Sequence, residues 1–136
     1  IDASAYRHGC RSLRLHDLLA GGVQAGQHGI RLAAAQYLPA LKSKTRYVLT
    51  YFCRTEGVKG AEKAEALGAC VNVYCRQGSN LFFDSHGGTE PWTKHAVEFT
   101  TPADTNQGED KAYVRLFFLN ADGSAWFDDV RLREAD

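Results

Sequence analysis

The sequence predicts an all-β sandwich of two antiparallel sheets, and three observations lead to this fold class. Short segments rich in aromatic and β-branched residues recur along the chain, with glycine, asparagine and aspartate between them. No long helical pattern separates these segments, which argues against alternating strands and helices. The 136 residues, of which 44% are hydrophobic and 24% charged, suit a single domain with a substantial core.

The first half of the chain contains one ambiguous segment and one clear strand. Residues 30–41 carry apolar side chains at helical spacing, but Pro39 would interrupt such a helix, so we predict a strand over residues 31–38. Residues 47–55, YVLTYFCRT, combine aromatic and β-branched side chains and give the clearest strand signal. Residues 60–68 have a helix-forming composition but room for only about two turns, so we expect a loop with one helical turn.

The middle of the chain predicts a hairpin. Residues 69–76, ACVNVYCR, read as a strand, and the turn-like sequence QGSN follows them. Residues 81–84 are then expected to return as a short antiparallel partner.

Three further strands are predicted toward the C-terminal end. Residues 93–100 form the first, after a glycine-rich loop at 86–90. Residues 112–119 and 125–133 form the other two. The segment NADG lies between them and is typical of a hairpin turn, because Asn, Asp and Gly tolerate positive φ.

Charge and hydropathy exclude two classes of partner. The 16 basic and 16 acidic residues give a net charge of +0, so no overall field favours nucleic acid, and no apolar run is long enough for a membrane span. Basic residues predominate in the first 60 positions and acidic residues afterwards. Since strands from both halves of a sandwich lie side by side, we expect cross-strand charge pairs, with a local basic patch as the alternative.

The spacing of the cysteines does not indicate a metal-binding knuckle. Cys10, Cys53, Cys70 and Cys75 contain no Cys-x-x-Cys spacing, and sequence alone leaves three pairings open. We expect buried thiols rather than a disulfide framework, because Cys53 and Cys75 end strand-like segments and can point into the core.

Alternation along the strands places aromatic rings beside arginines. In residues 47–55, 69–76 and 112–119, every second side chain is apolar and predicted to face the core, and the remaining side chains face outward. From these outward sets we predict the following ligand-binding residues: Phe52, Arg54, Tyr74, Arg76, Tyr113, Arg115 and Phe117.

This combination of side chains suits a sugar. An aromatic ring stacks on the apolar C–H face of a pyranose, while guanidinium groups donate hydrogen bonds to hydroxyl or carboxylate oxygens. Arginines in three strands favour an acidic or sulfated glycan. The alternative is a solvated or loop-covered sheet face, on which the rings are cross-strand pairs and the arginines meet acidic neighbours.

Several motifs resemble those of carbohydrate-binding modules of the galactose-binding-like jelly-roll type, the group of families four, nine and twenty-two. They are the Tyr-x-Leu-Thr-Tyr order at 47–51, the Gly-Gly-Thr to Trp-Thr segment at 87–93, Glu-Phe-Thr-Thr-Pro at 98–102 and GSAWFDDVRL at 123–132. Residues 8–15 look like the early strand of such modules. The resemblance spans nearly the whole chain and implies a jelly-roll sandwich that binds glycan.

The same resemblance implies a structural calcium ion. In such modules the first Asp of the pair at 128–129 often binds calcium together with backbone carbonyls of the early loop, here near residues 8–11, so Asp128 is the expected metal ligand. Nothing before Ala5 resembles the usual first strand, which also supplies a Glu partner. We therefore expect residues 1–136 to be one domain excised from a larger multidomain enzyme and lacking that strand.

These inferences lead to a noncatalytic carbohydrate-binding module that holds an appended glycoside hydrolase or polysaccharide lyase near its polymer. The expected partners are a polysaccharide or oligosaccharide and the catalytic domain of the same parent chain, and the resemblance implies an extracellular, cell-surface or periplasmic location. No Gly-x-Ser-x-Gly, His-Glu-x-x-His or phosphate-loop motif is present. The alternatives are a structural accessory sandwich that binds no sugar and, third, a lectin-like adhesin or enzyme subunit.

Overall fold

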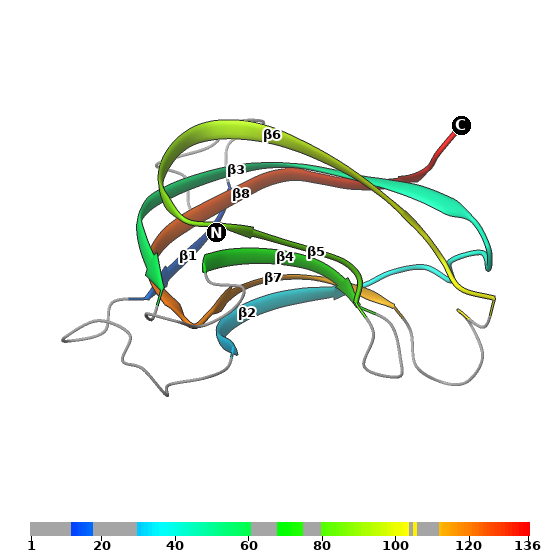
Figure 1. Ribbon diagram of the computed structural model, residues 1–136, viewed down its shortest axis with the longest axis horizontal. Helices are drawn as coiled ribbons and strands as arrows, with labels where there is room; N and C mark the ends of the chain where they lie inside the picture. Colours follow the sequence, from blue (N-terminus) through cyan, green and yellow to red (C-terminus); the bar gives the residue numbers. More distant parts are fainter. Residues whose placement is uncertain (1–11, 18–29, 61–67, 75–79, 104, 106–111) are drawn as a thin grey trace.

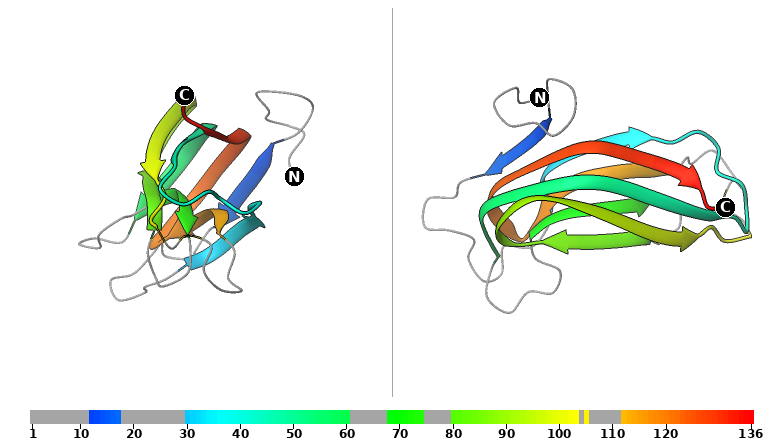
Figure 2. Two further views of the ribbon diagram at one scale, coloured as in Figure 1. Left: turned by 90° about the vertical axis from the view of Figure 1, so that its right-hand side faces the viewer. Right: turned by 90° about the horizontal axis from the view of Figure 1, so that it is seen from above.

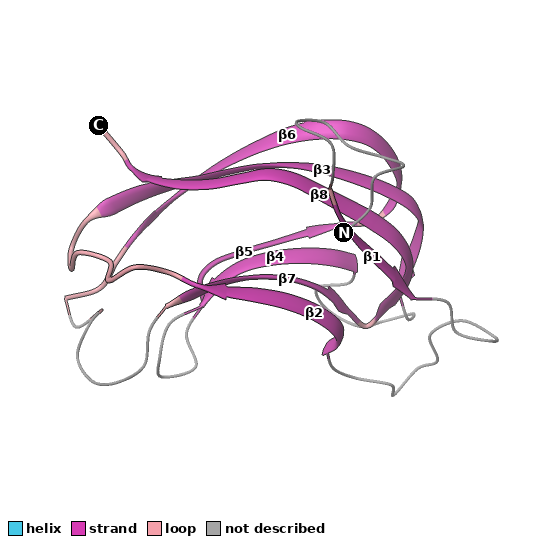
Figure 3. Ribbon diagram, turned by 180° about the vertical axis from the view of Figure 1, so that it is seen from behind, coloured by secondary structure: helices cyan, strands magenta, loops and turns pink. Residues whose placement is uncertain are grey.

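The computed structural model describes residues 12–17, 30–60, 68–74, 80–103, 105 and 112–136. These residues form eight strands: β1 (Leu13–Asp17), β2 (Ile30–Tyr37), β3 (Arg46–Gly60), β4 (Gly68–Tyr74), β5 (Asn80–His86), β6 (Gly88–Thr100), β7 (Tyr113–Leu119) and β8 (Ala121–Glu134). Figure 3 shows strands and loops but no helix in this part of the chain. The described residues accordingly contain no helix long and apolar enough to cross a membrane.

The strands form two packed antiparallel sheets, as the sequence predicts. The first sheet has the order β1-β8-β3-β6 and the second the order β2-β7-β4-β5. Figure 2, seen from above, shows β1 and β6 at the two edges of the first sheet. Both sheets are curved, and the outer face of the second sheet, which points away from the first, lies on the inside of the curve (Figure 1). We call this surface the concave face.

Alternating side chains from both sheets fill the space between the layers. Leu49 and Tyr51 of β3 are fully buried there, together with Val71 of β4, Phe118 of β7 and Phe127 of β8. The predicted core faces of residues 47–55, 69–76 and 112–119 are confirmed for these positions, because the two-residue period of a strand is a local property of the sequence.

The predicted hairpin at NADG is wrong. Strands β7 and β8 belong to different sheets, and Asn120, with a φ of 49°, is the single residue between them. Residues Ala121, Asp122 and Ser124 pair instead with the end of β3. Positive φ at Asn120 thus allows the chain to cross from one sheet to the other. The residue types that favour such a crossing are the same as those that favour a hairpin turn.

The predicted loop at 86–90 is also wrong. His86 ends β5, and β6 begins at Gly88, so that Gly87 alone links the second sheet to the first. The distant end of β3 bulges and pairs with Gly88 and Glu90, which holds this segment in a strand despite its glycines. The hairpin of β4 and β5 and the strand expected at 31–38 are confirmed. The helical turn expected at 60–68 falls largely on residues 61–67, outside the described residues.

Charge pairing between the two halves of the chain is confirmed for two pairs. Lys42 Nζ lies 2.8 Å from a Glu134 carboxylate oxygen, and Arg46 Nε lies 3.8 Å from one of Glu98. Among the described residues, Cys53 and Cys70 are buried free thiols. Cys10 and Cys75 lie outside the described residues.

Candidate functional site

Strand register brings polar and aromatic side chains into rows on the concave face. Tyr113 of β7 pairs with Tyr37 of β2 on one side and with Tyr74 of β4 on the other. Two residues further along β7, Arg115 pairs with Asn72 of β4. Because residues two apart on a strand share a face, the tyrosines form one row and Arg115 lies in the next.

The tyrosine row is a continuous aromatic surface. The ring centroids of Tyr74 and Tyr113 are 5.2 Å apart, and those of Tyr37 and Tyr113 are 6.1 Å apart with the rings edge to face. Tyr37 is 72% exposed, and the other two side chains are half-buried. Three rings from three neighbouring strands therefore present an apolar surface to solvent on a rigid frame.

Arg115 is held in place beside this row. Its guanidinium carbon lies 4.4 Å from the ring centroid of Phe117, and its Nε donates a 3.3 Å hydrogen bond to Oδ1 of Asn72. Asn72 is buried, and its Nδ2 donates to Oδ1 of Asn80 over 2.6 Å. The rings of Tyr74 and Tyr113 lie 5.8 Å and 5.9 Å from the same guanidinium carbon. These contacts orient the cation within the aromatic surface.

Four of the seven predicted ligand-binding residues meet on the concave face, namely Tyr74, Tyr113, Arg115 and Phe117. Phe117 is only 1% exposed and lies beneath Arg115, so it supports the arginine and offers no open ring. Arg76 lies outside the described residues.

Phe52 and Arg54 lie apart from this group, on the outer face of the first sheet. Their neighbours Tyr51 and Cys53 point into the core between the layers, so Phe52 and Arg54 point away from it. The sequence pattern gives the face of each strand but not the sheet to which the strand belongs. For this reason, it grouped side chains that lie on opposite sides of the sandwich.

Trp126 lies beneath arginines on that opposite side. The guanidinium carbon of Arg54 is 4.7 Å from the Trp126 ring centroid, and that of Arg14 is 5.2 Å away. Trp126 is only 5% exposed, and the neighbouring Phe127 is buried in the core. The convex outer face of the first sheet thus presents Arg14 and Arg54 over a covered indole rather than an open ring.

Three residues of the concave face were missed by the sequence analysis as site residues: Tyr37, Asn72 and Asn80. Tyr37 lies within residues 30–41, whose helical spacing obscured the direction of its side chain. Asn72, in contrast, follows the strand alternation, which predicts that its side chain faces outward. On the same face, burial raises the pKa of the Cys70 thiol to about 11, which keeps it protonated at neutral pH.

Asp128, the expected calcium ligand, lies on β8 where the pairing with β3 is irregular. Its Oδ1 accepts a 2.7 Å hydrogen bond from the backbone nitrogen of Asp129, whose φ is 51°. The carbonyls expected to share the ion, near residues 8–11, lie outside the described residues. Calcium at Asp128 therefore stays a prediction.

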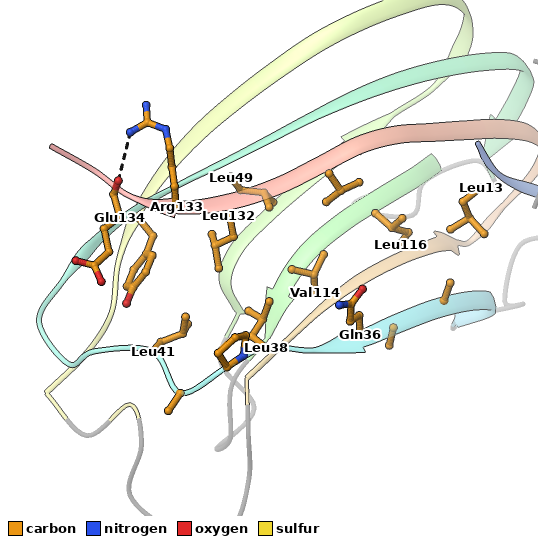
Figure 4. A pocket seen from close by; sticks show the side chains of 16 residues that line it. Leu13, Gln36, Leu38, Leu41, Leu49, Val114, Leu116, Leu132, Arg133 and Glu134 are labelled. Atoms are coloured by element: carbon orange, nitrogen blue, oxygen red, sulfur yellow. Dashed lines mark hydrogen bonds between the residues drawn. The ribbon is translucent and has the colours of Figure 1, made fainter. Parts of the chain in front are cut away.

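A second feature of the structure is a cavity of about 630 Å³ between the layers. Figure 4 shows Leu49 and Leu132 of the first sheet and Val114 and Leu116 of the second among its lining side chains. The lining is mostly aliphatic, and the polar side chains of Gln36, Arg133 and Glu134 also contribute to it. Cavities of this size accept small organic molecules.

No family model and no curated protein matches this chain. Several solved structures, in contrast, match this chain. A structure described as "Family 16 Carbohydrate Binding Module-2" matches with a TM-score of 0.61 and 19% identity, covering 97% of this chain and 82% of that one. A structure described as "CBM4 structure and function" matches with a TM-score of 0.57 and 13% identity over 76% of this chain. This chain spans 61% of the length of that second structure.

A cyclase has a similar structure. The cyclase from Fischerella sp. TAU, in complex with 4-(1H-Indol-3-yl)butan-2-one, matches with a TM-score of 0.60 and 19% identity, covering 94% of this chain and 65% of that one. All three likenesses concern the fold. This chain has the jelly-roll β-sandwich fold that carbohydrate-binding modules adopt.

Proposed function

We propose that this chain is a noncatalytic glycan-binding module whose site is the concave face. The observation that carries the proposal is the row of Tyr37, Tyr113 and Tyr74 beside the oriented guanidinium of Arg115. The carbohydrate-binding modules with the same fold support it.

The arrangement matches what a polysaccharide offers. Successive pyranose rings present apolar C–H faces, which suit a row of aromatic rings, and the hydroxyl groups around them accept hydrogen bonds from a guanidinium. Arg115 is held by Asn72 and by the ring of Phe117, so little of its side-chain entropy is lost on binding. The curvature of the sheet allows a chain lying across it to contact several strands.

We extend this proposal to the class of ligand, to the protein that carries the module and to its location. The ligand is an acidic or sulfated polymer, because the fork of Arg115 matches a carboxylate or sulfate. The module is attached to a polysaccharide-processing enzyme and raises the local concentration of that enzyme at its substrate. It functions outside the cell or in the periplasm, where such polymers occur.

Affinity electrophoresis tests the proposed site. The chain should be retarded by at least one polymer in a panel of β-glucan, xylan, galactan, uronic-acid and sulfated polymers. Alanine at both Tyr74 and Tyr113 should weaken binding by at least about tenfold, because the stacking surface is lost. Phe52→Ala, on the opposite face of the sandwich, serves as the matched control and should leave retardation unchanged.

Two results would contradict this assignment. One is retardation that persists in the folded Tyr74→Ala, Tyr113→Ala variant but disappears in Phe52→Ala, which would place the site on the first sheet. The other is no retardation of the folded wild type by any polymer in the panel, which would favour a structural accessory sandwich.

The cavity between the layers supports a second candidate function, the binding of a small apolar molecule. Its volume of about 630 Å³ and its aliphatic lining favour this function, and the cyclase of similar fold was crystallised with an indole compound. Ala34→Phe, which places a ring in the cavity from β2, should abolish binding of an indole probe measured by fluorescence. Unchanged probe binding in the folded variant would exclude this cavity as the binding site of the probe.

A further inference from the structure

Three side chains capable of binding a metal converge at one edge of the sandwich. Asp84 and His86 belong to β5, the edge strand of the second sheet, and His95 belongs to β6, the edge strand of the first. Figure 1 shows the chain turning from one sheet into the other between β5 and β6. One ligand atom from each of the three residues lies within 4.8 Å of the other two.

Tyr51 of β3 links two members of this cluster. Its hydroxyl donates a 2.9 Å hydrogen bond to Oδ2 of Asp84 and lies 2.8 Å from Nε2 of His86. That nitrogen and Asp84 Oδ2 are 3.6 Å apart. In a tetrahedral shell with metal bonds of about 2.0–2.1 Å, neighbouring ligand atoms are about 3.3 Å apart, so small side-chain movements bring these two into coordination distance.

His95 provides an independent observation that points to a ligand at this cluster. Its Nε2 is buried and has no hydrogen-bond partner among the residues that the structure describes. The ring is fixed by stacking on Tyr51, with centroids 5.0 Å apart, and it lies 4.3 Å from the His86 ring. A buried polar atom without a partner is costly, and a metal ion at this position would remove that cost.

The donor set selects the kind of ion. Two imidazole nitrogens and one carboxylate oxygen are ligands for zinc and related transition metals, whereas calcium requires oxygen ligands. Three protein ligands leave a fourth position for water or for the Tyr51 hydroxyl. The ion has a route to the site, because the Asp84 side chain is 35% exposed while His86 is only 8% exposed.

We propose that Asp84, His86 and His95 form a zinc-binding site that ties the two sheets together where β5 continues into β6. The site is separate from the concave face, because these side chains point between the layers. It also differs in position and ligand chemistry from the calcium expected at Asp128.

Isothermal titration calorimetry with Zn²⁺ tests this site on the full chain after treatment with a chelator. The wild type should bind one equivalent, and zinc should raise its thermal midpoint. His95→Phe keeps a ring against Tyr51 but removes the ligand atom, and Asp84→Asn removes the carboxylate. Each should weaken zinc binding by about a hundredfold or more and abolish the thermal shift.

His16→Gln is the matched control, because His16 is exposed and its Nδ1 contacts Ser124 at 2.6 Å, away from the cluster. This variant should bind zinc as the wild type does. The proposal is overturned if the wild type binds no zinc, or if folded His95→Phe binds it as tightly as the wild type, as would occur with binding through cysteine thiols. The visible spectrum of the Co²⁺-substituted chain should show tetrahedral coordination that His95→Phe loses.

Discussion

Replacing Gly68 with alanine should destabilise the fold by about 3 kcal/mol or more. Gly68 begins β4 with a φ of +133°, a conformation that side chains rarely adopt. An added Cβ would lie 2.2 Å from the backbone oxygen of His86. The pairing of Ala69 with His86 prevents the two strands from moving apart without losing the ladder.

Urea denaturation followed by circular dichroism measures this effect, and Gly87→Ala is the control. At Gly87 an added Cβ meets no atom of the described part of the chain within 4 Å, and the φ lies outside the positive region that disfavours side chains. This variant should unfold within about 0.5 kcal/mol of the wild type. Equal losses in the two variants would show that strain at Gly68 is not the cause.

Arg115→Gln should weaken binding of acidic polymers by roughly 10-fold to 100-fold. A hydrogen bond to a charged group contributes about 1.5–3 kcal/mol, and glutamine removes the charge and the contact with the Phe117 ring. Neutral polymers should lose much less affinity, because their hydroxyl groups form weaker bonds with the cation. Binding of acidic polymers by the wild type should also fall as salt is added.

Arg54→Gln provides the comparison for this prediction. Arg54 also contacts an aromatic ring, that of Trp126, but on the outer face of the first sheet. Titration of the same polymers should give wild-type affinity for this variant. If Arg54→Gln weakens binding as much as Arg115→Gln, the concave face is not the site that binds the acidic groups of the polymer.

Much of the fold follows from local patterns in the sequence. The alternation in residues 47–55 and 112–119 places Leu49 and Phe118 in the core, and the structure confirms both. The hairpin of β4 and β5 also follows from its turn residues. These features are predictable because side-chain direction along a strand and the φ preferences of turn residues depend on immediate sequence neighbours.

Membership of a sheet depends instead on pairing between distant segments, and there the sequence patterns failed. The NADG segment satisfies the requirements of a hairpin, but its strands separate into different layers because Asp122 and Ser124 pair with β3. Phe52 and Tyr74 both face outward on their strands, yet they lie on opposite sides of the molecule.

At the candidate sites, too, the direction of a side chain is predictable from the sequence, whereas its neighbours from other strands are not. Strand alternation alone predicts that Tyr74, Tyr113 and Arg115 point away from the core. That these side chains meet on one face depends on strand pairing, since register places Tyr37 beside Tyr113 and Asn72 beside Arg115. The tertiary structure also brought Asp84 and His86 of one sheet to His95 of the other. Strand periodicity is local, whereas register and layer packing are set by contacts between residues far apart in the chain.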